Sequence, residues 1–126
     1  MLFDTDILIW HFRGDRTASH AIDACAEPAI SIVTYMEMIQ GARDRDEVRA
    51  IRALLRDLPL RIIPLSENIG HRAAIYLEEY GLRVALGIAD SLIAATAVES
   101  NLPLVTGNKK HFGAIQDLRI QAFRPL

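Results

Sequence analysis

The chain has 126 residues, of which 51% are hydrophobic, and its formal net charge is −2. This length and composition predict one folded domain over residues 1–126 and exclude a largely disordered chain. A charge so close to zero gives no overall attraction to nucleic acid. Any contact with RNA or DNA must therefore depend on local basic clusters or on a bound cation.

Cysteine content and hydropathy indicate the compartment. Cys25 is the only cysteine, which excludes an internal disulfide and a thiolate metal cluster. No apolar run has the length needed to cross a bilayer, and the first residues carry acids where a secretory leader carries basic residues. We therefore expect a cytoplasmic protein that does not contact a membrane.

Short apolar runs alternate with helix-like segments along the chain. The short, mainly apolar runs predict buried parallel strands at residues 1–3, 29–33, 60–65, 104–106 and 118–123. The segments between them predict helices at residues 7–12, 17–26, 34–40, 46–58, 67–80 and 88–100, with a loop or single turn at 107–113. This alternation predicts an α/β fold, a three-layer α/β/α sandwich with a central parallel sheet.

Acidic residues follow these strands or begin the helices after them. Asp4 follows the first strand. Asp4 and the other acids at these positions each have a purely structural explanation. Asp4 or Asp6 can cap the next helix, and an acid in a first turn, such as Asp90, complements the helix macrodipole. Thr34 and Glu37 fit a capping box at the start of the third helix.

A metal site explains the same acids together. The carboxyl ends of parallel strands meet at one sheet edge, so Asp4, Glu37 and Asp90 are expected to converge there. Glu37 and Asp90 stand among apolar neighbours, and a buried lone carboxylate is costly unless it is paired or binds a metal. Oxygen donors suit Mg²⁺ or Mn²⁺ better than zinc. The four histidines lack metal-ligand spacing and are interpreted as surface or packing residues.

Four segments in this order resemble the PIN-domain ribonucleases, and among them the VapC-type toxins of type II toxin–antitoxin systems. They are residues 3–9 (FDTDILI), 31–41 (SIVTYMEMIQG), 90–97 (DSLIAATA) and 104–112 (LVTGNKKHF). The resemblance spans nearly the whole chain and implies a PIN-like fold. It also implies an endoribonuclease that hydrolyses RNA phosphodiesters with a water activated by carboxylate-bound Mg²⁺ or Mn²⁺.

The resemblance also implies roles for individual acids. Asp4, Glu37 and Asp90 match the three central acidic positions of the family, which bind the metal and support catalysis. Asp6 stands where the family carries a small polar residue, so we expect it in or near the site. Asn108 stands where a fourth acid often follows, which removes one charge from the expected site.

Other residues are expected around this centre. Thr106 is expected to orient the site through its hydroxyl group, and Arg43, Lys109 and Lys110 to attract RNA phosphates. The resemblance further implies a homodimer and an inhibitory VapB-like antitoxin as the partner.

Two other functions remain open from the sequence. A haloacid dehalogenase-like phosphatase would use Asp4 as nucleophile and Asp6 as general acid. That class needs a late acidic pair, whereas the only acids after Asp90 are the widely separated Glu99 and Asp117, and the chain is short for it. A non-catalytic PIN binding module is the third possibility, which Asn108 keeps open.

Overall fold

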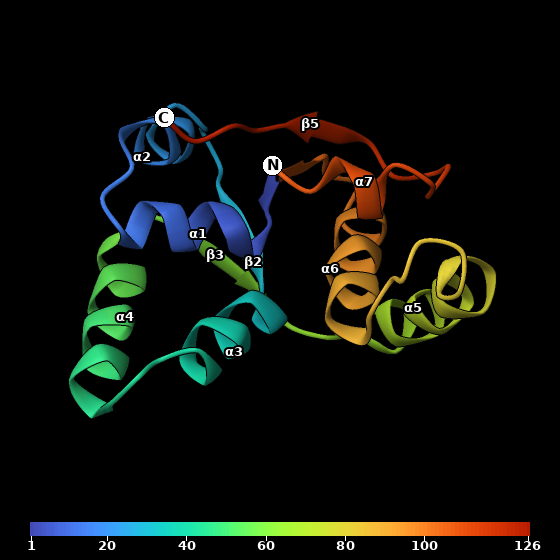
Figure 1. Ribbon diagram of the computed structural model, residues 1–126, viewed down its shortest axis with the longest axis horizontal. Coiled ribbons are helices and arrows are strands. Elements are labelled where there is room, and N and C mark those ends of the chain that lie inside the picture. The colour runs from blue at the N-terminus through green and yellow to red at the C-terminus, as the bar shows by residue number, and fades with distance from the viewer.

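A single parallel sheet lies at the centre of the protein (Figure 1). The computed structural model describes residues 1–126. All neighbouring strands are parallel, and Leu2 in the central strand lies opposite Ala29 on one side and Leu104 on the other. The carboxyl ends of all five strands therefore lie at the same edge. The strands, in spatial order, are β3 (Arg61–Ile63), β2 (Ala29–Ser31), β1 (Leu2–Phe3), β4 (Leu104–Thr106) and β5 (Ile120–Ala122).

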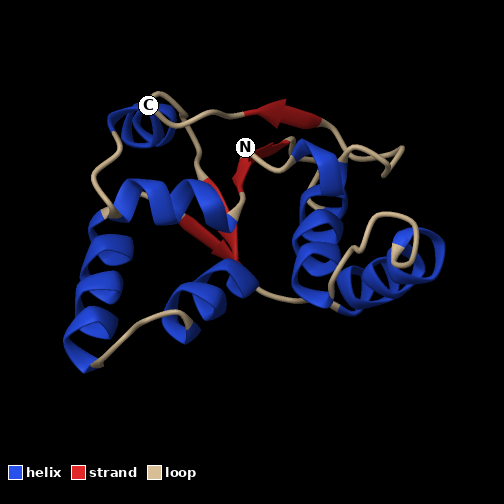
Figure 2. Cartoon of the chain, in the orientation of Figure 1, coloured by secondary structure: helices blue, strands red, loops and turns tan.

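Seven helices connect or flank these strands (Figure 2). Asp or Ser side chains cap the first five, each accepting a backbone N–H bond that the helix itself cannot satisfy. No helix is both long enough and apolar enough to cross a membrane. The helices are α1 (Thr5–Phe12), α2 (Arg16–Asp23), α3 (Ile32–Gln40), α4 (Arg45–Asp57), α5 (Glu67–Tyr80), α6 (Ile88–Glu99) and α7 (Lys109–Phe112).

The sheet separates two hydrophobic clusters, because successive strand residues point to opposite faces. In β1, Leu2 packs into the cluster that contains side chains of α5 and α6, and Phe3 into the cluster of α1, α2 and α4. In β4, Leu104 and Val105 divide in the same way. Figure 1 shows the two helix groups on either side of the strands. This arrangement confirms the predicted α/β/α sandwich.

The second strand ends two residues earlier than predicted, and this changes the capping of α3. Ser31 is its N-cap, and the Ser31 hydroxyl accepts the N–H of Val33 at 3.0 Å. The predicted capping box between Thr34 and Glu37 is therefore wrong, since both residues lie inside the helix. Ser31 and Thr34 are both able to cap, and the pattern of apolar residues does not distinguish between them. Glu37 consequently lies in the second turn of α3, not the first.

The bounds of α1 and α2 also differ from the prediction. Helix α1 begins at Thr5 because Asp4 caps it, not at residue 7. Helix α2 begins at Arg16, capped by Asp15, and ends at Asp23.

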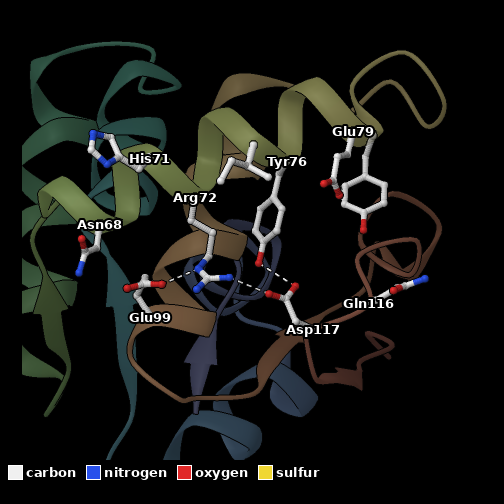
Figure 3. A pocket seen from close by; sticks show the side chains of 10 residues that line it. Asn68, His71, Arg72, Tyr76, Glu79, Glu99, Gln116 and Asp117 are labelled. Carbon is white, nitrogen blue, oxygen red and sulfur yellow. Dashed lines mark hydrogen bonds and ion pairs between the residues drawn. The ribbon is translucent and has the colours of Figure 1, made fainter.

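A polar cluster joins α5, α6 and the segment before β5 (Figure 3). Arg72 forms ion pairs with Glu99 and with Asp117, the second at 2.7 Å, and the Tyr76 hydroxyl donates to Asp117 at 2.8 Å. Burial and the bond to Asp117 raise the pKa of Tyr76, so this hydroxyl keeps its proton. The cluster lines a cavity of about 530 Å³. It lies at the carboxyl end of α6, whereas Asp90 lies at the amino end.

Replacing Tyr76 with Phe should lower the free energy of unfolding by about 1 kcal/mol, since one half-buried hydrogen bond is lost. Urea denaturation measures this change. Tyr80→Phe is the matched control, because its hydroxyl makes no hydrogen bond to another side chain in the structure. Equal stability of the two variants would contradict the assigned role of the Tyr76–Asp117 bond.

Candidate functional site

Asp4 occupies the first position after the central strand, at the carboxyl edge of the sheet. The residue is 6% exposed. Asp4 Oδ1 accepts the N–H of Thr5 at 2.8 Å, and Oδ2 accepts the hydroxyl of Thr106 at 2.7 Å. Asp4 therefore caps α1 and is also held from β4, so the structural and functional explanations of this residue are compatible.

Negative charge gathers around Asp4. The pKa of Asp4 is raised to about 7, chiefly by burial, then by the nearby Asp6 and more weakly by Asp90. The hydrogen bonds from Thr106 and Thr5 act in the opposite direction and lower this pKa. Burial and Asp90 likewise raise the pKa of Asp6. No lysine or arginine lies within 4.0 Å of these three carboxylates. The protein therefore supplies no permanent cation to balance them.

Asp6 presents one oxygen to the protein and leaves the other without a partner. Asp6 Oδ2 accepts the N–H of Gly107 at 2.9 Å, whereas Oδ1 is buried and forms no hydrogen bond. A Cβ atom at Gly107 would lie 2.8 Å from Oδ2, so glycine permits this close approach. An unsatisfied buried carboxylate oxygen is unfavourable unless a ligand or ion binds it.

Glu37 joins this edge from α3. The Thr5 hydroxyl donates to Glu37 Oε1 at 2.6 Å and also contacts the Thr34 hydroxyl at 3.0 Å. Glu37 and Asp90 are only half-buried, with the Asp90 side chain 29% exposed. The expectation that apolar neighbours bury these two acids is therefore wrong, because part of each side chain faces the open edge.

Asp90 lies in the first turn of α6, as predicted. His111 Nδ1 lies 3.6 Å from Asp90 Oδ2, and the side chains of His111 and Asn108 share a hydrogen bond of 3.0 Å. Asn108 also donates its backbone N–H to the Thr106 hydroxyl at 2.9 Å. The sequence interpretation missed His111. Its only signal was the three-residue spacing from Asn108, which places both on one side of α7.

The three basic residues expected to attract RNA differ in whether an acid already pairs with them. Arg43 is bonded to Glu47 at 2.9 Å, and its side chain is 87% exposed. Lys109 and Lys110 are exposed on α7, next to Asn108, and form no ion pair. The two lysines therefore have free charges near the acidic edge, whereas the guanidinium of Arg43 is already paired with Glu47.

The donors at this edge have the chemistry that Mg²⁺ or Mn²⁺ prefers. They are carboxylate oxygens, of which those of Asp6 and Asp90 lie close enough to raise the pKa of Asp4. One oxygen of Asp6 is buried without a partner. In the present side-chain conformations, no three His, Cys, Asp or Glu side chains are grouped to hold a metal ion. Ligation would therefore require side-chain rotation, for which the half-exposed Asp90 has room. The residues fit the ion in charge and donor type.

Comparison with known proteins identifies the family. The PIN domain family matches residues 1–118. Ribonuclease VapC10 of Mycobacterium tuberculosis is 33% identical over 123 residues, covering 94% of this chain and 90% of that protein. Ribonuclease VapC1 of Methanocaldococcus jannaschii is 29% identical over 124 residues, covering 98% and 86%. The chain belongs to the PIN-domain family and, within it, to the VapC group.

Solved structures agree with this assignment. A chain of a toxin–antitoxin complex from Klebsiella pneumoniae is 36% identical, with a TM-score of 0.77 and coverage of 93% of both chains. A chain of VapBC2 from Rickettsia felis, bound to a DNA fragment from its promoter, gives a TM-score of 0.82 at 23% identity, over 98% of both chains. The second likeness supports the fold alone.

The haloacid dehalogenase-like phosphatase is not supported, because the structure lacks the late acidic pair that this class needs. Asp117, the only acid after Asp90 that follows β4, is bound to Arg72 and Tyr76. Glu99 pairs with the same arginine. These acids lie at the other end of α6 from Asp90. No late acidic pair is therefore available beside Asp4.

The buried charge of Asp4 makes metal-free stability depend on pH. The pKa of Asp4 is about 7 in the folded protein, whereas the ordinary value of 3.8 applies to the unfolded chain. Between these two pH values the folded protein therefore holds a proton that the unfolded chain has released. The stabilisation from this bound proton is complete below the unfolded-state pKa of 3.8 and is lost as the pH rises through the folded-state pKa of about 7. We expect the free energy of unfolding in EDTA, and Tm with it, to fall between about pH 4 and about pH 7 and to level off at higher pH. The slope should be roughly 1.4 kcal/mol for each pH unit between the two pKa values.

Asp4→Asn is the control for this titration, because it removes the group and should flatten the pH dependence measured by differential scanning fluorimetry. Parallel Tm curves for the wild-type protein and Asp4→Asn would contradict the raised pKa.

Proposed function

We propose that this protein is an Mg²⁺- or Mn²⁺-dependent endoribonuclease that acts as the toxin of a type II toxin–antitoxin pair. The observation that carries the proposal is the convergence of Asp4, Asp6 and Asp90 without a protein cation, with Glu37 tied to the same edge through Thr5. The names of the VapC relatives support RNA as the substrate.

Asp4, Glu37 and Asp90 would hold the metal, with Asp6 beside them. When bound, the metal neutralises phosphodiester oxygens and lowers the pKa of a coordinated water. The residues of the chain then have distinct tasks. Thr106 and the Thr5 N–H hold both oxygens of Asp4, which fixes its orientation. Hydrolysis by such a site leaves a 5′-phosphate and a 3′-hydroxyl.

RNA approach depends on local charge, because the net charge of the chain is −2. Lys109 and Lys110 are exposed and unpaired beside Asn108, so they are suited to attract backbone phosphates toward the acidic edge. Arg43 can contribute only if it exchanges Glu47 for a phosphate.

Asp90→Asn should reduce RNA cleavage by at least about 100-fold. Removing a residue that only orients a metal ligand lowers activity by up to about 100-fold, and the loss of a ligand itself should cost no less. The assay uses end-labelled structured RNAs with Mg²⁺, Mn²⁺ or EDTA, and maps the product ends. Asp46→Asn is the matched control, because it makes the same acid-to-amide change on a side chain that is 90% exposed on α4.

Cleavage that persists in EDTA or in Asp90→Asn would contradict the proposed site. Metal binding by the wild-type protein without cleavage of any RNA would instead favour the non-catalytic binding module.

The proposed partner is a VapB-like antitoxin, supported by the toxin–antitoxin complex that this chain resembles at 36% identity. A groove of about 410 Å³ between α1, α3 and α4 offers a place for it. Ile9, Phe12 and Met38 line the groove together with Glu37. A segment seated there would reach one of the acids of the proposed site, which would couple antitoxin binding to inhibition. The homodimer stays a prediction.

A further inference from the structure

Thr5 contacts two of the three central acids at once. It is the first residue of α1, and its backbone N–H donates to Asp4 Oδ1 at 2.8 Å. Its hydroxyl donates to Glu37 Oε1 at 2.6 Å. Asp4 follows the central strand and Glu37 belongs to the helix after the neighbouring strand, so Thr5 links acids from two separate segments of the chain.

The direction of the hydroxyl bonds follows from the number of available protons. A carboxylate can only accept, and a threonine hydroxyl has one proton to donate. The proton of Thr5 therefore goes to Glu37, and the contact with Thr34 at 3.0 Å must be a bond that Thr34 donates to Thr5. Thr34 is fully buried. The result is a directed chain from Thr34 through Thr5 to Glu37.

This chain supplies the orientation that Glu37 otherwise lacks. Glu37 is half-buried, has no ion pair, and has several rotatable bonds. Thr34 and Glu37 are three residues apart on α3, so they lie on the same face of the helix, and Thr5 bridges them from α1. Residues that orient metal ligands from outside the ligand set commonly change metal affinity 10–100-fold when they are removed.

We infer that Thr5 is a positioning residue of the metal site, acting through Glu37 and supported by Thr34. The inference rests on the proposed function, since it assigns Glu37 to the metal. It differs from a purely structural role, in which the Thr5 hydroxyl would only join α1 to α3 and would not alter metal affinity.

The test measures Mn²⁺ binding to the purified full-length chain by isothermal titration calorimetry, with Tm recorded for each variant. Thr5→Val removes the hydroxyl while keeping the backbone N–H to Asp4, and should weaken Mn²⁺ binding about 10–100-fold. Thr5→Ser keeps a hydroxyl and should bind like the wild-type protein. Thr34→Val should weaken binding in the same direction and by a smaller factor.

A double-mutant cycle then identifies the route of the effect. If Thr5 acts through Glu37, Thr5→Val causes no further loss of Mn²⁺ affinity when added to Glu37→Gln. An unchanged affinity in Thr5→Val, or an equal loss in both backgrounds, would overturn the inference. If Thr5→Val does not fold, Thr34→Val decides, and wild-type affinity in that variant would overturn it. Absence of Mn²⁺ binding by the wild-type protein would instead refute the proposed function.

Discussion

The burial of one carboxylate at the end of the central strand is the constraint on which the rest of the site depends. Asp4 is held by Thr5 and Thr106, yet its pKa is raised to about 7 by burial and by neighbouring acids. A core position that is costly for a charge is normally filled by an apolar or paired residue. Here the surrounding acids increase the cost, and the proposed metal would offset it. The same residue also caps α1, so the site and the fold share it.

The parallel sheet determines which residues can join Asp4. Strands β2 and β4 flank β1, and their carboxyl ends bring α3 and Thr106 to the same edge. Helix α6 presents Asp90 from its first turn. The polar cluster around Arg72 lies at the opposite end of α6, where two other acids, Glu99 and Asp117, have a structural role as its ion-pair partners. Glu99 and Asp117 are thus paired with an arginine, whereas the acids around Asp4 have no lysine or arginine beside them and are available to a cation.

The sequence predicted the α/β/α sandwich because short apolar runs indicate strands and the helical spacing of apolar residues indicates helices, and both patterns are visible within a few residues of the chain. It also predicted the positions of Asp4 and Asp90, which follow from where a strand ends and a helix begins. It placed the cap of α3 wrongly, since Ser31 and Thr34 have equivalent capping chemistry and tertiary packing decides between them. The contacts of Thr5 with Thr34, and of His111 with Asp90, join segments far apart in the chain. No periodicity or spacing reports such contacts.

The most direct test of this account is a crystal structure of the protein grown with Mn²⁺, with an anomalous difference map recorded near the manganese absorption edge. The account predicts a peak at the carboxyl edge of the sheet, bound by carboxylate oxygens that include those of Asp4 and Asp90. It also predicts that the peak is absent from crystals of Asp90→Asn grown in the same way. A fully folded wild-type protein with no peak at this edge, or with manganese bound only elsewhere, would contradict the central claim.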